Sequence, residues 1–161
     1  MNPEPTGQVV GNHLILTRTF NAPLNDVWAS ITNSESTARW FGPWEGDAGP
    51  GNVVRLKLVH EKSRPWIEVT IEECEAPRHL ILLMKDKSGD WRLDLTLTQA
   101  GDTTTLRFVQ HLSDPKLAGD VGPGWEYYLD MLVAAREGKA LPLFDDYYPA
   151  QKTYYLKGAS R

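Results

Sequence analysis

Alternation of apolar and polar residues along most of the chain predicts a series of strands. Between residues 12 and 20, Leu14, Leu16 and Phe20 share one face, which is typical of a half-buried strand. The turn Ser88-Gly89-Asp90 is one of several short breaks between such runs. Strands joined by short turns indicate an antiparallel meander. The further predicted strands lie at 53–60, 66–73, 79–85, 91–99 and 104–112.

A helical spacing of apolar residues predicts three helices. Pro23 suits the first turn of a short helix over 23–32. Ser34 is a suitable N-cap for a second short helix, which should end near Trp40, because a Gly-Pro pair follows. A longer amphipathic helix is predicted over 125–137.

The segments between and before these elements carry turn-forming residues. Residues 42–52 contain four glycines and two prolines and are predicted to be a loop. Gly138 is a plausible terminator of the long helix. Residues 1–11 are predicted to be a flexible lead-in, and residues 139–161 form a tail of little periodicity.

The order of these elements predicts an α+β architecture. A curved antiparallel sheet of about six strands with one solvated face needs a cover on its other face. The long helix near the C-terminus is the only long amphipathic element, so it should lie across the sheet. The two short helices after the first strand can close one end. A pocket between sheet and helix is the natural result, and ligand sites are usually concave and mostly apolar.

Length and composition indicate a single domain over 1–161, with its core at about 12–138. The net charge of −4, without a cluster of Lys or Arg, argues against a nucleic-acid partner. No apolar window approaches the roughly 18 residues of a membrane span. A polar N-terminus without signal-peptide features and a single cysteine favour the cytoplasm.

Motifs that carry catalysis or hold cofactors are missing from the sequence. It has no glycine-rich phosphate loop and none of the short zinc-protease, redox or serine-hydrolase motifs. A zinc site would need widely spaced histidines to converge. We therefore predict no cofactor, no metal and no catalytic residue. The histidines are His13, His60, His79 and His111.

Arg18 is the most informative polar residue of the first strand. It shares the parity of Leu16 and Phe20, so its side chain should point toward the covered face. A buried guanidinium must be paired or bind an anion. One interpretation is an anchor for a ligand carboxylate. The other, which we favour, is a salt bridge to a carboxylate on a neighbouring strand, or exposure at the strand edge.

Three motifs resemble one protein superfamily. Residues 17–23, TRTFNAP, followed by Val27-Trp28, resemble the opening of the SRPBCC superfamily, also called START or Bet v 1-like. Residues 39–43, RWFGP, resemble a motif of the branch that is similar to the C-terminal domain of the activator of the heat-shock-protein-90 ATPase. Gly124-Trp125, with Tyr128, Leu129 and Leu132, resembles the start of the last helix of that branch.

The resemblance implies a helix-grip fold with an internal cavity, but fold alone does not decide function. The favoured hypothesis is binding or sensing of an apolar small molecule. The alternatives are an enzyme of the cyclase or hydratase type and a co-chaperone-like protein-interaction module. The aromatic tail over 139–161 either packs back on the domain or covers a partner subunit, as in a homodimer.

The candidate cavity residues come from the inward parity of the strands, the inner face of the long helix and the aromatic residues near the expected mouth. They are Arg18, Trp40, Phe41, Leu56, Leu58, Trp66, Val69, Trp91, Leu93, Leu95, Phe108, Trp125, Tyr128, Leu129 and Leu132.

Overall fold

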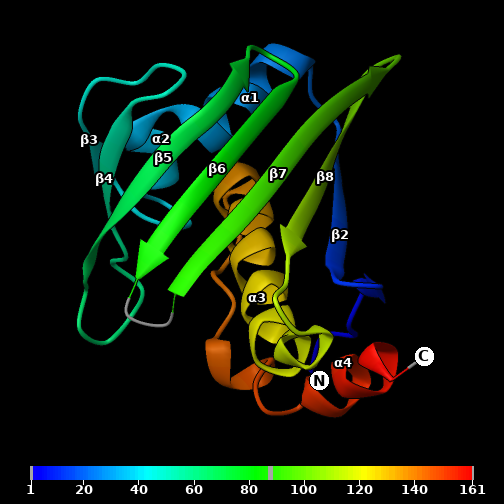
Figure 1. The fold of residues 1–161 in the computed structure, drawn as a ribbon. Coiled ribbons are helices and arrows are strands. Elements are labelled where there is room, and N and C mark those ends of the chain that lie inside the picture. The colour runs from blue at the N-terminus through cyan, green and yellow to red at the C-terminus, as the bar shows by residue number, and fades with distance from the viewer. Residues whose placement is uncertain (1, 87–88, 161) are drawn as a thin grey trace.

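The computed structural model describes residues 2–86 and 89–160, and it has the predicted α+β architecture. One antiparallel sheet of eight strands has the order β1-β2-β8-β7-β6-β5-β4-β3. Figure 1 shows the sheet in front of the long helix α3. The strands are β1 Gln8–Val10, β2 His13–Phe20, β3 Trp44–Glu45, β4 Val53–Lys57, β5 Trp66–Glu75, β6 His79–Asp86, β7 Gly89–Ala100 and β8 Thr103–His111.

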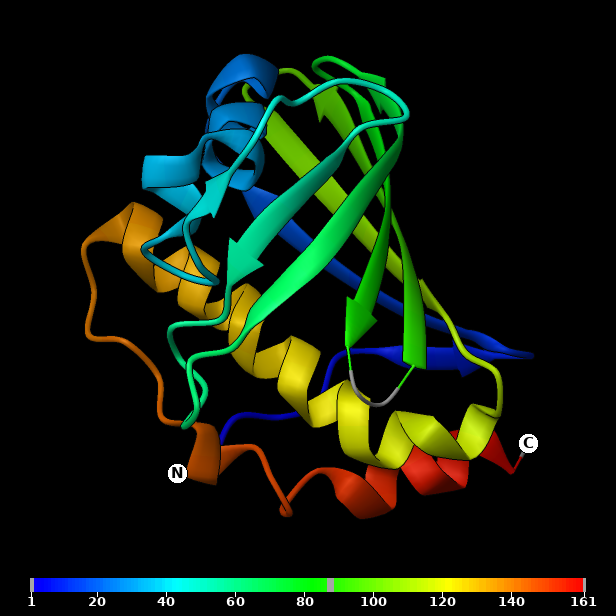
Figure 2. The same cartoon turned by 60° about the vertical axis from the view of Figure 1, so that its left-hand side comes forward.

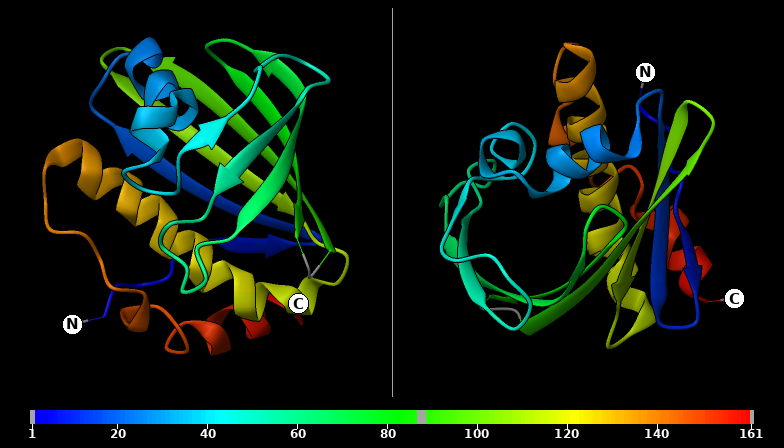
Figure 3. Two further views of the ribbon diagram at one scale, coloured as in Figure 1. Left: turned by 90° about the vertical axis from the view of Figure 1, so that its left-hand side faces the viewer. Right: turned by 90° about the horizontal axis from the view of Figure 1, so that it is seen from above.

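The helices cover one side of the curved sheet. The view from above in Figure 3 shows the sheet curving beside α3, with α1 and α2 across one end. Figure 2 shows α4 lying along α3 at the opposite end. The helices are α1 Leu24–Thr32, α2 Ser34–Thr37, α3 Ala118–Glu137 and α4 Lys152–Ala159, with single 3-10 turns at Pro115–Leu117 and Phe144–Asp146.

The six predicted strands are all present, and two short strands add to them. β1 lies in the predicted flexible lead-in, where Val9 pairs with Leu14 of β2. β3 lies in the predicted loop and pairs with β4 through Trp44 and Leu56. Strands of two or three residues are too short to show a period of two, so neither was predicted.

The long helix begins at Ala118, upstream of the predicted start at Trp125. The Gly-Pro-Gly sequence at 122–124 lies inside the helix and does not open it. Gly122 is buried where the ring of Tyr155 packs directly on the helix backbone, so this glycine provides close packing and not a turn. Gly138 ends the helix in the left-handed conformation, with φ of 66°, as predicted.

The predicted N-cap of α2 is wrong, and one predicted turn lies partly outside the described residues. Asn33, and not Ser34, caps α2, because its side chain accepts hydrogen bonds from the backbone N–H groups of Glu35 and Ser36. The hydroxyl of Ser34 instead donates to the Trp44 carbonyl, at 2.8 Å. Ser88 of the predicted turn lies outside the described residues, and β7 begins at Gly89.

Candidate functional site

A cavity of about 160 Å³ lies between the sheet, α3 and the segment around α2. We call it the inner chamber. Its walls are the inward side chains of β4 to β8, which alternate with solvent-facing residues, together with aromatic residues from the loop after α2. The predicted cavity residues that line it are Trp40, Phe41, Leu56, Val69, Leu93, Leu95, Phe108 and Trp125.

A second, wider space of about 470 Å³ adjoins the first and reaches the loop between β4 and β5. We call it the outer chamber. The predicted residues Leu58, Trp91 and Tyr128 line this space, and Phe41 and Trp125 line both chambers. Sequence reasoning missed Met84, which also lines both, because its strand was predicted without a clear inward face.

The polar groups of the inner chamber are already engaged with the protein. Three tryptophans line it, and the indole N–H group of each donates to an oxygen of the protein. The hydroxyl of Thr37 likewise donates to a backbone carbonyl. The chamber therefore offers a ligand apolar surface and aromatic faces. The indole bonds run from Trp40 to Ser30 O (2.9 Å), from Trp44 to Thr32 O (2.9 Å) and from Trp125 to Gln110 Oε1 (2.6 Å).

The outer chamber is more polar. The Tyr128 hydroxyl donates to the Glu61 carboxylate at 3.0 Å, which joins α3 to the β4–β5 loop. Burial, together with the nearby charge of Glu61, raises the pKa of Tyr128 far above its usual value. Burial and the charge of Arg64 lower the pKa of His60, so its imidazole is neutral at pH 7.

Arg18 lines neither chamber. Its guanidinium forms ion pairs with Glu126 at 2.9 Å and Asp130 at 3.0 Å. The predicted inward direction is confirmed, but both partners lie on α3 and not on a neighbouring strand. Its placement in the ligand cavity was therefore wrong. We call Arg18, Glu126, Asp130, Tyr147 and Tyr155 the clasp.

The clasp joins the two ends of the chain to the long helix. The buried carboxylate of Glu126 accepts hydrogen bonds from Thr6, Gly7, Arg18 and the Tyr155 hydroxyl. Burial alone would raise the pKa of Glu126, but these hydrogen bonds outweigh it and hold the pKa below its usual value. The carboxylate is therefore ionised and fully partnered at neutral pH.

The aromatic tail packs back on the domain through the same cluster. The Tyr147 hydroxyl donates to Asp130 at 2.7 Å, and Tyr155 is completely buried. Gln151 donates from its side chain to the Pro3 carbonyl, at 3.1 Å, so the tail also contacts the N-terminal segment. The tail is thus part of the folded unit.

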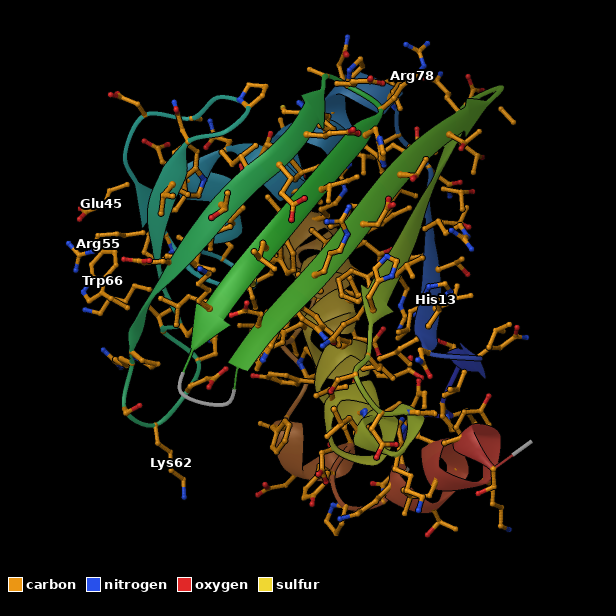
Figure 4. The ribbon with its side chains drawn as sticks, in the orientation of Figure 1. His13, Glu45, Arg55, Lys62, Trp66 and Arg78 are labelled. Carbon is orange, nitrogen blue, oxygen red and sulfur yellow. The ribbon has the colours of Figure 1, made fainter. Side chains whose placement is uncertain are left out.

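Trp66 was wrongly predicted to line the cavity. Its side chain is 42% exposed on the outer face of the sheet, where the guanidinium of Arg55 lies 4.6 Å from its ring. Figure 4 shows Glu45, Arg55 and Trp66 together at the outer edge of β3 to β5. The physical reason is parity, because Trp66 precedes the inward-facing Ile67 and must point the other way.

Two predicted residues are buried without reaching either chamber. Leu129 and Leu132 are each 1% exposed and belong to the core under the sheet. They support the chamber wall from α3 but do not line it. The burial of Glu126 was not predicted from the sequence. Glu126 precedes Leu129 by about one helical turn, so the two side chains lie on the same face of α3, and this spacing could have indicated the burial.

The described part of the chain has no cluster of three or more His, Cys, Asp or Glu side chains placed to hold a metal ion. Within residues 2–86 and 89–160, no helix is both long enough and apolar enough to cross a membrane.

A family model described as "Activator of Hsp90 ATPase homolog 1-like protein" matches residues 21–137. The chain belongs to this family. Membership in the activator homologue family confirms the resemblance to the SRPBCC superfamily. No curated protein matches the sequence.

Solved structures show the same fold as this member of the activator homologue family. CalU16 from Micromonospora echinospora has a TM-score of 0.78 and 22% identity, over 98% of this chain and 97% of that one. A Bordetella parapertussis protein has a TM-score of 0.74 and 21% identity, over 100% and 94% of the two chains. DynU16, a protein of the dynemicin biosynthetic locus, has a TM-score of 0.70 and 17% identity, over 87% of this chain and 51% of that chain.

Proposed function

We propose that this protein binds or senses a hydrophobic small molecule in the inner chamber. The observation that carries the proposal is an apolar, aromatic-lined cavity whose three indole N–H groups are already hydrogen-bonded within the protein. Ligand sites are typically concave and mostly apolar. An apolar cavity of about 150 Å³ can hold a molecule such as benzene, and the inner chamber has about 160 Å³.

The lining of the inner chamber favours binding over catalysis. A cyclase or hydratase would need an acid–base pair beside the bound substrate. Among the described residues that line this chamber, Cys74 is the only side chain of an ionisable type. We therefore propose a carrier or sensor, and the enzyme and the interaction module stay as alternative predictions.

A substitution that fills the inner chamber tests the proposal. Leu82 lines the chamber from β6, whereas the adjacent Leu83 does not line it and pairs with Thr70 and Arg92 of the flanking strands. Affinity for toluene, a neutral hydrocarbon only slightly larger than benzene, is measured by titration calorimetry. We expect Leu82→Trp to weaken binding by at least about tenfold, or about 1.4 kcal/mol.

Leu83→Trp is the matched control and should bind toluene as the wild type does. Circular dichroism and thermal unfolding establish that both variants are folded. Equal toluene affinity in all three proteins, or no binding to the wild type, would contradict the proposal. Native mass spectrometry of the purified protein would additionally detect a small molecule that copurifies with it.

A further inference from the structure

The two chambers adjoin each other, and three side chains of the described residues line both of them. Phe41, Met84 and Trp125 line both spaces, and the rings of Phe41 and Trp125 lie 5.6 Å apart between centroids. Met84 is unbranched and adapts its shape more readily than the other two. A ligand longer than the inner chamber would therefore extend past these side chains into the outer chamber.

The outer chamber differs from the inner one in the hydrogen-bonding groups that it offers. Three carboxylates of the described residues line it, those of Glu61, Asp120 and Asp145, and an ionised carboxylate only accepts hydrogen bonds. The hydroxyl of Tyr128 is occupied as a donor, because it bonds to Glu61. Acceptors thus predominate where the end of an extended ligand would lie.

Among the described residues, the positive charges near this space do not balance its carboxylates. Lys62 is the only Lys or Arg among the described lining residues, and in Figure 4 its side chain extends away from the domain. Lys152 contacts Asp120 at 3.2 Å and offsets that charge from outside the lining. Glu61 and Asp145 therefore make the chamber negative. Arg18 cannot receive an anion here, because the clasp already pairs it with two carboxylates.

We infer that the ligand is an amphiphile whose apolar part fills the inner chamber and whose polar end, in the outer chamber, is a cationic hydrogen-bond donor such as an amine. This inference rests on the proposed function and adds the chemical class of the ligand. It excludes fatty acids and other carboxylates as preferred ligands, because their anionic end would meet Glu61 and Asp145.

Three probes of one chain length and different end groups test the inference. Decylamine, which is an ammonium ion at pH 7, decan-1-ol and decanoate are titrated into the protein below their critical micelle concentrations, and heats of binding are recorded by calorimetry. We expect the amine to bind about fivefold or more tighter than decanoate, with the alcohol between them. The difference should shrink in high salt, because the carboxylates are exposed.

A pair of charge-matched variants separates the outer chamber from the overall charge of the protein. Glu61→Gln with Asp145→Asn removes the two lining carboxylates and should abolish the preference for the amine. Glu68→Gln with Asp102→Asn removes two exposed carboxylates that line neither chamber, and it should keep the preference.

Each further outcome has a distinct meaning. Decanoate binding as tightly as the amine to the wild type overturns the inference. A preference that survives in the Glu61 and Asp145 variant, or that falls equally in both variants, also overturns it, since the outer chamber is then not its source. If none of the three probes binds, the proposed function fails together with the inference.

Discussion

The inner chamber and the clasp both border α3, but they differ in the polarity of their side chains and in how completely these fill the space. At the clasp, the partly exposed charge of Arg18 is paired with the buried charge of Glu126, and the surrounding hydroxyl and amide groups complete the hydrogen bonds of Glu126. At the inner chamber, apolar side chains surround a space of about 160 Å³ that the protein does not fill. α3 contributes Glu126 to the first region and Trp125 to both chambers.

This difference separates the region that stabilises the fold through polar contacts from the region that contains an unfilled cavity. Trp125 and Glu126 are adjacent in α3, so the chambers and the clasp lie on different faces of the helix. The clasp face is closed by a specific polar network and by the tail, whereas the chamber face borders a cavity at a cost in stability, because a cavity loses packing contacts. We therefore expect substitutions in the clasp to change stability and substitutions in the chambers to change binding.

The largest effect is expected for Glu126→Ala. The substitution leaves the largely buried guanidinium of Arg18 with Asp130 as its one remaining ion-pair partner among the described residues, and it removes the acceptor of Thr6, Gly7 and Tyr155. Breaking a buried ion pair by removing one partner costs about 3–5 kcal/mol in free energy of unfolding, and urea unfolding measures the loss. Glu137→Ala, at the exposed end of the same helix, should cost less than about 0.5 kcal/mol. Similar losses for both variants would show that the clasp does not stabilise the fold.

Smaller effects of opposite sign on the free energy of unfolding are expected at two glycines of α3. A Cβ added at Gly122 would lie 2.6 Å from the ring of Tyr155, whereas a Cβ at Gly124 would meet nothing within 4 Å. Gly122→Ala should therefore lower the free energy of unfolding by about 1–3 kcal/mol through overpacking. Gly124→Ala should raise it by about 0.5–1 kcal/mol, since alanine favours the helix. Thermal unfolding measures both, and changes of the same sign would contradict the close packing of α4 on α3.

The smallest effect on the free energy of unfolding is expected for Trp66→Ala, because Trp66 lies on the outer face of the sheet and lines neither chamber. The variant loses the contacts of the Trp66 ring with Arg55 and Lys57 on the solvent face, so the free energy of unfolding should fall by about 0.5–1 kcal/mol. The affinity for toluene should not change. Reduced toluene binding by this folded variant would place the binding site on the outer face of the sheet.

Much of the architecture follows from periodicity in the sequence. Alternation correctly predicted the inward faces of β2, β5, β7 and β8, and with them Leu93, Leu95 and Phe108 of the inner chamber. The start of α3 was not predictable from local signals, because glycines that normally end helices serve here as contact points for a distant tail. Trp66 was misplaced because its aromatic character was given more weight than its parity.

The partners of Arg18 could not have been predicted. Parity showed that its side chain points under the sheet, but Glu126 and Asp130 meet it only because α3 crosses β2 at that point. The crossing position depends on the sheet curvature and on the tail, which are set by long-range packing. The outer chamber depends on the same geometry, since it joins the β4–β5 loop to α3 through Glu61 and Tyr128.

The separation of clasp from chamber has a consequence for divergence within the fold. Solved structures with 22% identity or less superpose over most of this chain, so the backbone tolerates wide sequence change. Apolar cores accept exchange of side chains when their total volume is kept. If the chamber binds a ligand as we propose, exchanges among Leu, Met and aromatic residues would alter its selectivity without changing the charged network that joins both ends of the chain to α3.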